Sequence, residues 1–379
     1  MTATPHGGAS TSRRAFLAGA LAAGAAAAVS PGTAFAAAAP HGTAARPDAA
    51  VAPAAVTPST DVHIFYYPWY GSPQVNGSWR HWPQGGLTPP NGIASNFYPQ
   101  LGAYDSGDSA VVAQHMTWLR QAGVGTLITS WWGQGSYEDQ RVPLLLDQAN
   151  AKGLKVGFHI EPYTNRTAAS VVSDVNYILS TYGSHPAFYR DSRHGNRGAF
   201  YVFQSLYISD WSPIESVKSQ AIVLTQTTDI SKAAHFGGMY TYDGIAAAQL
   251  PDWSGVDRFC KANGLVWSPS FGPGYIDDRA VPGNTTPTVD RANGATYDKV
   301  WQHAITSGDG GSAPAWVSIT SFNEWHEGSQ IEPASATPPT NPVTYMTYNG
   351  AYGKTGTAAQ SAYIDRTAYW VPQYVAHHG

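Results

Sequence analysis

Charged residues are scarce in this sequence. They make up 12% of the 379 residues, and the formal net charge at pH 7 is −4. A protein that binds nucleic acid needs clustered Lys and Arg to pair with phosphates, but here 21 basic residues are outnumbered by 25 acidic ones. The composition therefore argues against nucleic acid as a partner and favours an uncharged one.

Cysteine is almost absent as well. Cys260 is the one cysteine, so no internal disulfide can form. It stands in the middle of an expected helix before Gly264, which predicts a packed thiol rather than a nucleophile. No glycine-rich phosphate loop follows the first expected strand, and no repeat of solenoid length occurs. A disulfide scaffold, a nucleotide-binding fold and a solenoid are all disfavoured.

The first 36 residues predict an export signal. The pair Arg13-Arg14 precedes an Ala-rich apolar run over residues 18–29, and Ala34-Phe35-Ala36 fits a cleavage site. The run is too short and too rich in Ala for a stable membrane span. Residues 37–60 are mainly Ala, Pro and Thr and predict a linker without a core. We expect a twin-arginine signal peptide, this linker, one domain over 61–379, and a secreted or periplasmic location.

Short runs rich in β-branched or aromatic residues recur along the expected domain at the spacing of parallel strands joined by crossovers. Eight such runs cover residues 62–67, 126–130, 155–160, 199–203, 221–225, 238–242, 265–268 and 316–320. Helical periodicity lies between several of them, over 109–122, 142–151, 168–179 and 297–306. Gly123, Gly153 and Gly264 stand where left-handed helix caps are expected. The pattern predicts an α/β protein with a single (β/α)8 TIM barrel.

Aromatic and polar residues follow these strands at the end where a barrel carries its active site. Aromatic residues reach 12% of the chain, and flat aromatic faces stack well on sugar rings. The alternative is that the aromatic excess simply fills the core. Because the residues collect behind strand ends, we expect a carbohydrate-binding cleft formed by Tyr67, Trp69, Trp132, Glu161, Tyr240, Tyr242, Asn323, Trp325 and His326.

Two carboxyl groups in the last strand-end segment fit the needs of glycoside cleavage. This reaction requires a proton donor to the leaving oxygen and a second carboxylate beside the anomeric carbon. Glu324 and Glu327 are three positions apart and flanked by Trp325 and His326, so both can face the same cleft. We expect them to be the catalytic pair. Glu332 is as well suited to anchoring the loop as to touching a substrate.

Several stretches resemble glycoside hydrolase family 99, the endo-α-1,2-mannosidases and endo-α-1,2-mannanases. The resemblance runs in order over nearly all of the expected domain, and its most specific element is Asn-Glu-Trp-His-Glu-Gly at 323–328. The other matching stretches are Phe-Tyr-Tyr-Pro-Trp-Tyr-Gly at 65–71, His-Ile-Glu-Pro-Tyr at 159–163, Gly-Pro-Gly-Tyr at 272–275, and residues 318–332 around the specific element.

The resemblance implies retaining cleavage inside α-mannosidic chains without a metal or other cofactor. In the family the sugar's own 2-hydroxyl attacks the anomeric carbon and gives a 1,2-anhydro sugar, which water then opens. The carboxylate matching Glu324 assists the attack, and the group matching Glu327 protonates the departing oxygen. The axial 2-hydroxyl of α-mannose lies trans to the leaving group, so it needs no enzyme nucleophile, and the usual carboxylate-separation rule does not apply to this pair.

The resemblance also implies binding roles. Glu161 matches a substrate-binding Glu, and Tyr67, Trp132, Tyr240 and Tyr242 fall at subsite positions. Two departures from the family pattern, Phe203-Gln204-Ser205 and Tyr242-Asp243-Gly244, affect hydroxyl recognition more than the chemical step. The expected partner is an oligosaccharide or polysaccharide, and the expected state is a monomer.

Three other interpretations stay open on the sequence. A barrel that binds carbohydrate without cleaving it keeps the aromatic platforms but gains nothing from paired carboxyl groups. A metal-dependent hydrolase needs His159, Glu161 and His326 to meet, and no His-x-x-x-His or Asp-rich spacing supports it. The same chemistry on a different α-glycan is the third.

Overall fold

The computed structural model describes residues 56–242, 250–308 and 313–378. Their strands form one parallel sheet in the order β7-β6-β5-β4-β3-β2-β1-β9-β8. The strands are β1 (Ser59–Tyr66), β2 (Val124–Trp131), β3 (Lys155–Ile160), β4 (Gly198–Val202), β5 (Ala221–Gln226), β6 (Gly238–Tyr240), β7 (Val266–Ser268), β8 (Ser270–Phe271) and β9 (Val317–Ile319). All eight expected strands are present. The seventh, expected over 265–268, corresponds to β7, and the short strand β8 follows it after Pro269.

Pro269 separates β7 from β8. Proline has no N–H for the ladder, so it interrupts pairing inside a sheet. Its carbonyl still accepts a hydrogen bond from the Ser318 N–H at 2.9 Å. On one side β7 pairs with β6, and on the other β8 pairs with β9. The sheet therefore closes through the interrupted strand, which confirms the (β/α)8 barrel.

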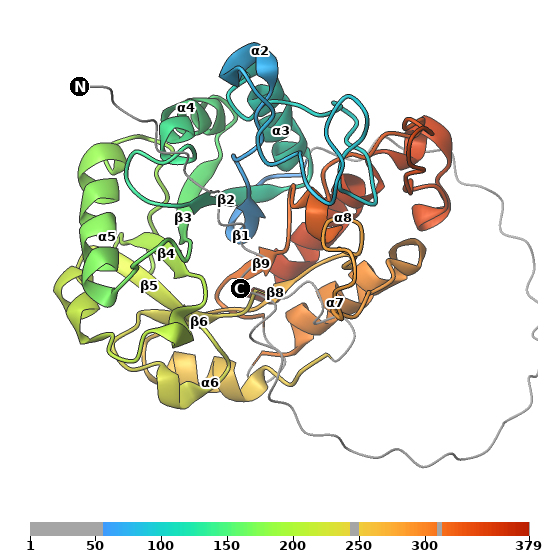
Figure 1. The fold of residues 1–379 in the computed structure, drawn as a ribbon. Helices are drawn as coiled ribbons and strands as arrows, with labels where there is room; N and C mark the ends of the chain where they lie inside the picture. Colours follow the sequence, from blue (N-terminus) through green and yellow to red (C-terminus); the bar gives the residue numbers. More distant parts are fainter. Residues whose placement is uncertain (1–55, 243–249, 309–312, 379) are drawn as a thin grey trace, which may run out of the picture. The chain divides into compact units, whose positions relative to one another are not determined.

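Helices surround the strands (Figure 1). They are α3 (Ser109–Gln121), α4 (Val142–Ala151), α5 (Ala168–Tyr182), α6 (Ser254–Ala262), α7 (Ala295–Thr306) and α8 (Ala362–His378), with the single turn α2 (Pro73–Asn76) in the loop after β1. The four expected helices are confirmed, and Gly123, Gly153 and Gly264 have the expected positive φ of 77°, 69° and 64°. After β4 and β5 the connections contain only short 3₁₀ turns, which are η2 (Ser205–Tyr207), η3 (Ser212–Val217) and η4 (Ile230–Lys232).

The interior of the barrel is aromatic and polar rather than aliphatic. Tyr201 lies in its centre, where its hydroxyl meets His63 Nδ1 at 2.7 Å and Ser268 Oγ at 3.1 Å. Phe65 packs against Tyr201 and His159 one layer higher. Seven of the 13 Trp residues are fully buried, so the core accounts for much of the aromatic excess.

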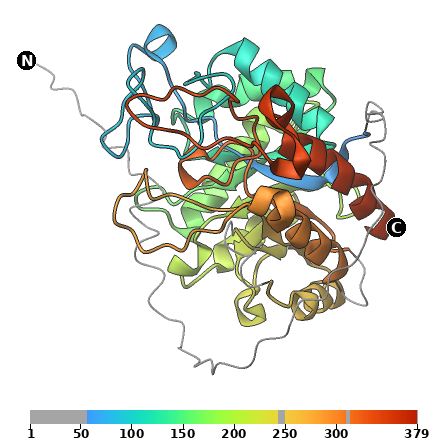
Figure 2. The ribbon, with the colours of Figure 1, turned by 90° about the vertical axis from the view of Figure 1, so that its right-hand side faces the viewer.

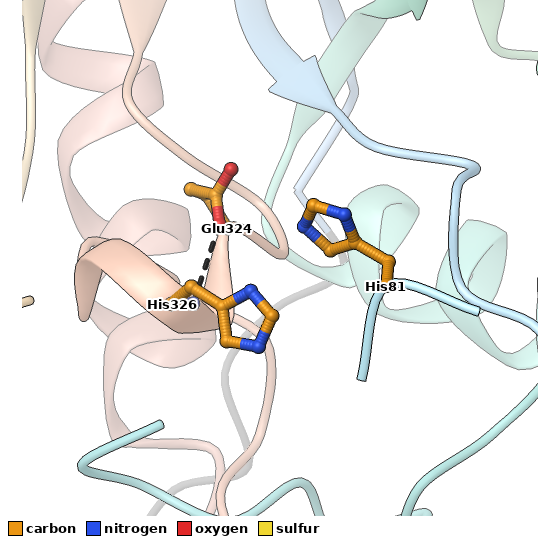
Figure 3. A group of neighbouring side chains, drawn as sticks. All are labelled: His81, Glu324 and His326. Atoms are coloured by element: carbon orange, nitrogen blue, oxygen red, sulfur yellow. Dashed lines mark hydrogen bonds between the residues drawn. The ribbon is translucent and has the colours of Figure 1, made fainter. Parts of the chain in front are cut away.

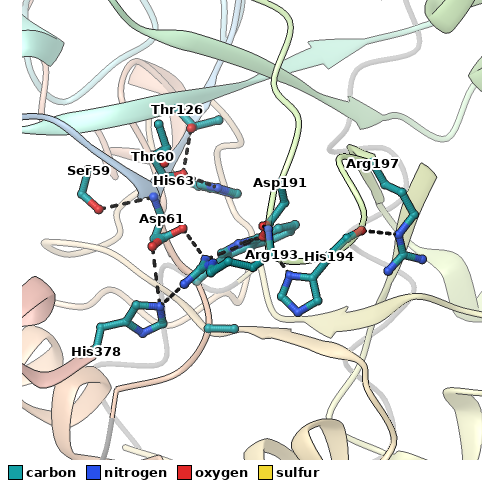
Figure 4. A network of polar contacts seen from close by, with 12 residues as sticks. Ser59, Thr60, Asp61, His63, Thr126, Asp191, Arg193, His194, Arg197 and His378 are labelled. Atoms are coloured by element: carbon teal, nitrogen blue, oxygen red, sulfur yellow. Dashed lines mark hydrogen bonds and ion pairs between the residues drawn. The ribbon is translucent and has the colours of Figure 1, made fainter. Parts of the chain in front are cut away.

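A polar network fastens the amino-terminal ends of the strands (Figure 4). Arg193 in the segment before β4 pairs with Asp61 of β1 at 2.5 Å and contacts His378 at the end of α8. Asp191 accepts a hydrogen bond from Trp316 Nε1 at 3.0 Å, just before β9. The network therefore joins the first strand, the segment before β4, the last strand and the last helix.

The opposite ends of the strands carry the long loops. Figure 2 shows the loops after β1, in blue to cyan, and after β9, in red, extending from the same side of the barrel. No helix within the described ranges is long and apolar enough to cross a membrane. The expected signal peptide and most of the expected linker lie outside the described residues, whereas Ser59 and Thr60 belong to β1.

Candidate active site

The carboxyl pair lies on a 3₁₀ turn directly after β9. The turn, η8 (Trp325–Glu327), begins after Glu324, whose Oε1 accepts the His326 N–H at 3.2 Å. It ends at Gly328, which has a φ of 59°. Side chains three positions apart lie on the same side of a 3₁₀ turn. Glu324 and Glu327 are 1% and 2% exposed, so both are held away from bulk water.

Asn323 joins this turn to the first strand. Its Oδ1 accepts the Tyr67 N–H at 2.8 Å, and its Nδ2 donates to the Tyr67 carbonyl at 3.0 Å and to the Tyr104 hydroxyl at 3.2 Å. The amide is completely buried and occupied by these contacts. In this arrangement Asn323 holds the turn against the end of β1, and its amide group is not directed to solvent.

Trp325 is a second buried support. Its Nε1 donates to Glu332 Oε2 at 2.7 Å, and the Tyr104 hydroxyl donates to the same oxygen at 2.8 Å. His115 Nε2 lies 3.1 Å from the other oxygen, Glu332 Oε1. Glu332 is 0% exposed and thus anchors the end of the loop. Anchoring was one of the two roles considered from the sequence, and contact with a substrate was the other.

A row of aromatic side chains begins beside Glu327 and leads to the loop after β1. The Tyr242 hydroxyl lies 3.4 Å from Glu327 Oε2 and 2.6 Å from the Tyr67 hydroxyl. The Tyr67 ring stacks on Trp69 with centroids 4.5 Å apart, and Trp69 stacks on His81 at 3.8 Å. A continuous wall therefore runs from Glu327 to His81.

His81 completes this wall by approaching His326, with ring centroids 4.8 Å apart. Figure 3 shows His81, Glu324 and His326 around one space, the first from the loop after β1 and the others from the turn after β9. One nitrogen or oxygen atom from each of the three lies within 4.8 Å of the others, so the group could hold a metal ion. The metal site considered from the sequence consisted of His159, Glu161 and His326. Within the described residues these three do not form such a group.

Glu161 lies in a separate cluster after β3. Ser130 Oγ donates to its Oε1 at 2.8 Å, and His159 Nδ1 lies 3.4 Å from the same oxygen. His159 Nε2 is 2.9 Å from the Tyr240 hydroxyl, and the His159 ring stacks on Tyr242. The ends of β2, β3 and β6 are thereby tied to the aromatic wall.

Trp132, after β2, is half-buried, and its buried Nε1 has no hydrogen-bond partner in the described part of the chain.

Burial raises the pKa of the Glu138 carboxyl group, and the negative charge of Glu161 raises it further. Burial also raises the pKa of Tyr70, and the negative charge of Glu324 raises it further. Carboxyl groups are thus concentrated in poorly hydrated surroundings at this end of the barrel.

Sequence reasoning missed some of these residues as members of the site. Ser130 and Arg166 were not assigned to the site. Arg166 donates to the Ile160 and Gln204 carbonyls at 3.1 Å and so holds the loops after β3 and β4. His81 stood in a Trp-rich segment but was not assigned a role. A lone polar residue beyond a strand gives no signal until the fold brings its partners together.

A cavity of about 220 Å³ lies elsewhere, against the back of the turn at Gly328. Its lining includes Tyr275, Ile276, Arg291 and Tyr348 but none of the candidate site residues. The convergence of carboxyl groups and aromatic rings, rather than this cavity, locates the candidate site.

Known proteins resemble the chain over most of its length. The sequence model of glycosyl hydrolase family 99 matches residues 58–376. The mouse glycoprotein endo-alpha-1,2-mannosidase is 36% identical over 83% of this chain and 74% of its own, and the Xenopus laevis protein of the same name is 39% identical over 73% and 70%. The GH99 endo-alpha-mannosidase structure from Bacteroides thetaiotaomicron superimposes with a TM-score of 0.74 at 35% identity, covering 85% of this chain and 100% of that one. The chain therefore belongs to glycoside hydrolase family 99 and is a glycoside hydrolase.

Proposed function

We propose that the enzyme cleaves α-1,2-mannosidic linkages inside mannan or mannose-rich glycans, with retention of anomeric configuration. The observation that carries the proposal is the pair Glu324 and Glu327 on one buried turn at the carboxyl ends of the strands. The relatives named endo-alpha-1,2-mannosidase support mannose as the sugar and internal bonds as the target.

In the proposed first step, Glu324 removes the proton of the 2-hydroxyl while O2 attacks the anomeric carbon. The bond from that carbon to the glycosidic oxygen breaks, and this oxygen takes the proton of Glu327. The product is a 1,2-anhydro sugar. Proton transfer of this kind contributes roughly 10²- to 10⁴-fold to a rate.

In the second step, water attacks the anomeric carbon and gives a proton to Glu327. The bond from that carbon to O2 breaks, and O2 recovers its proton from Glu324. Two inversions give net retention, and both carboxyl groups return to their starting states. The Tyr242 hydroxyl, 3.4 Å from Glu327 Oε2, is placed to orient that carboxyl group in both steps.

The remaining candidate residues divide into two roles. Tyr67, Trp69, Tyr242 and His326 surround the carboxyl pair and are proposed to contact the sugar beside the cleaved bond. Glu161, Tyr240 and Trp132 are proposed to bind neighbouring sugars, and the buried Trp132 Nε1 without a partner is a donor for a hydroxyl group. Asn323 and Trp325 serve as supports of the turn.

The test is incubation of the purified full chain with an α-1,2-branched mannan, with reducing ends and product anomers followed by NMR. We expect internal cleavage with retention, lost by about 10²-fold or more in both Glu327→Gln and Glu324→Gln. Glu215→Gln is the matched control, because Glu215 is an exposed residue of η3 that contacts Lys218 and His235. Full activity of either site variant contradicts the assignment.

A second substrate separates the proposed intermediate from an enzyme nucleophile. An oligosaccharide with a 2-deoxy sugar at the reacting position lacks the attacking hydroxyl. The proposed mechanism predicts that it binds but is not cleaved, whereas an enzyme carboxylate acting as nucleophile would still cleave it.

The two departures from the family pattern, at residues 203–205 and 242–244, bear on which glycan the enzyme binds. Gln204 has a φ of 51°, and its N–H is bound by Gln226 Oε1 at 2.6 Å. Asp243 lies outside the described residues. If α-mannans are not cleaved, other α-glycans are the next substrates to test with the same variants.

We also propose export through the twin-arginine signal over residues 1–36 and a monomeric state. Replacement of Arg13 and Arg14 by Lys is expected to retain the protein in the cytoplasm, which cell fractionation measures. The mass from light scattering checks the monomer.

A further inference from the structure

The space between His81, Glu324 and His326 has the chemistry of a transition-metal site. It brings two imidazoles and one carboxylate together, with one ligand atom from each within 4.8 Å of the others (Figure 3). Imidazole nitrogens suit Zn²⁺, whereas Mg²⁺ and Ca²⁺ are bound mainly by oxygen atoms. The donor set therefore favours a zinc-like ion over the alkaline-earth ions.

His326 supplies an independent indication. Its side chain is 0% exposed, and neither ring nitrogen has a hydrogen-bond partner within the described residues. A buried polar group without a partner is rare and costs free energy. A ligand that reaches His326 would satisfy one of these nitrogens at the position where Glu324 and His81 converge.

The geometry needs only a modest contraction. Zinc binds nitrogen and oxygen at about 2.1 Å, so tetrahedral ligand atoms are roughly 3.4 Å apart. The present separations of up to 4.8 Å require side-chain rotations. The His326 imidazole has no side-chain hydrogen bond to break within the described residues, and the His81 ring stacks on Trp69. Three protein ligands leave the fourth position for water or a sugar hydroxyl.

We propose that His81, Glu324 and His326 form a Zn²⁺-binding site, and that occupancy of this site inhibits the glycosidase. The inhibition rests on the proposed function, in which a Glu324 oxygen must accept the proton of the 2-hydroxyl. A metal ion bound to that oxygen takes the lone pair that the proton needs. It also fills the space beside Trp69 that the proposed substrate would enter.

The metal site is tested first, without reference to activity. The full chain is purified without a polyhistidine tag, treated with EDTA, desalted and titrated with ZnCl₂ in a calorimeter. We expect one ion per chain, and we expect His81→Ala and His326→Ala to weaken binding by about 100-fold, since even outer-shell partners of a metal are worth roughly 10- to 100-fold. His377→Ala, an exposed position in the last turn of α8, is the matched control. Unchanged affinity in His81→Ala overturns the site, and so does equal binding of MgCl₂.

Co²⁺ gives a second readout, because its visible absorption becomes stronger when a protein site with few ligands replaces the six waters of the free ion. The band is expected with the wild-type chain and His377→Ala and is expected to be lost in His326→Ala. Circular dichroism of each variant checks that it is folded. A band that persists in His326→Ala contradicts the assignment of the ligands.

Activity then tests the consequence. Cleavage of α-mannan by the EDTA-treated enzyme is expected to fall on addition of Zn²⁺ and to return with EDTA. If the treated enzyme is inactive until Zn²⁺ is added, the site is catalytic and the inhibitory role is wrong. If neither form cleaves α-mannan, the proposed function fails, while the calorimetric result still decides the metal site.

Discussion

Acid should destabilise this barrel through one buried histidine. His63 of β1 is 0% exposed. Its Nδ1 lies 2.7 Å from the Tyr201 hydroxyl and its Nε2 lies 3.0 Å from the Thr60 carbonyl. Burial lowers its pKa to about 3, outweighing the Thr60 hydrogen bond and the Asp191 charge, both of which raise the pKa. The folded protein therefore holds His63 neutral at pH values where the unfolded chain protonates it.

The sign and the size of the effect follow from linkage. The folded pKa is lower than the unfolded value, so the stabilisation is complete above pH 6.5 and is lost as the pH falls towards about 3. A difference of 3.5 pKa units corresponds to roughly 5 kcal/mol over the whole range, and the part lost between pH 7 and pH 5 is about 2 kcal/mol.

The assay is urea unfolding of the wild type and His63→Gln at pH 8, 7, 6 and 5. Gln can donate to the Thr60 carbonyl and accept from Tyr201 but does not titrate. Burial raises the pKa of Asp174 to about 6, so the contribution of Asp174 has the opposite sign and is lost as the pH rises through about 6. Because both proteins contain Asp174, it cancels in their difference. Parallel pH profiles for the two proteins would refute the reasoning.

Three further outcomes are expected. Gly328→Ala should lower the free energy of unfolding by about 2 kcal/mol or more and impair cleavage, because Gly328 has a φ of 59° and a Cβ would lie 2.5 Å from Ile276 Cγ2. Gly264→Ala is the control in the same unfolding assay. Gly264 has a φ of 64° with no atom within 4 Å of an added Cβ, so this variant measures the backbone effect alone. Glu332→Gln should cost about 1 to 3 kcal/mol by thermal or urea unfolding, because the amide nitrogen cannot accept a hydrogen bond inside the buried cluster of Trp325, Tyr104 and His115. A stability equal to the wild type contradicts this. Burial raises the pKa of Cys260 to about 12, so Ellman's reagent at pH 8 should label the thiol only after unfolding, and rapid labelling of the folded protein contradicts this.

The regular part of the fold was predictable because it depends on local patterns. Strands and helices were recognised from periodicity and from glycines such as Gly123, which adopt the left-handed conformation that the pattern requires. Local patterns did not indicate that the connections after β4 and β5 lack α-helices. They also could not indicate that Pro269 divides one strand in two, since the run before it already reads as a complete strand.

The candidate site was only partly predictable, for a different reason. Residue type and position after β9 identified Glu324 and Glu327, but not which neighbours point into the cleft. Trp325 shares their turn, yet its indole is directed to Glu332 in the interior. His81 gave no comparable signal, because its relation to His326 depends on a contact across 245 residues (326 − 81) of chain.

The position of the carboxyl pair makes the site depend on closure of the barrel. The pair follows β9, the last strand, and β9 lies beside β1, the first. At this seam Asn323 holds the backbone of Tyr67, 256 residues away, through two hydrogen bonds. At the other end of the same seam, Arg193 joins Asp61 to α8. The wall from Tyr67 to His81 and the turn with both carboxyl groups therefore come from opposite ends of the domain. They meet only when the first and last strands pair, so loosening this seam should lower activity before the central strands unfold.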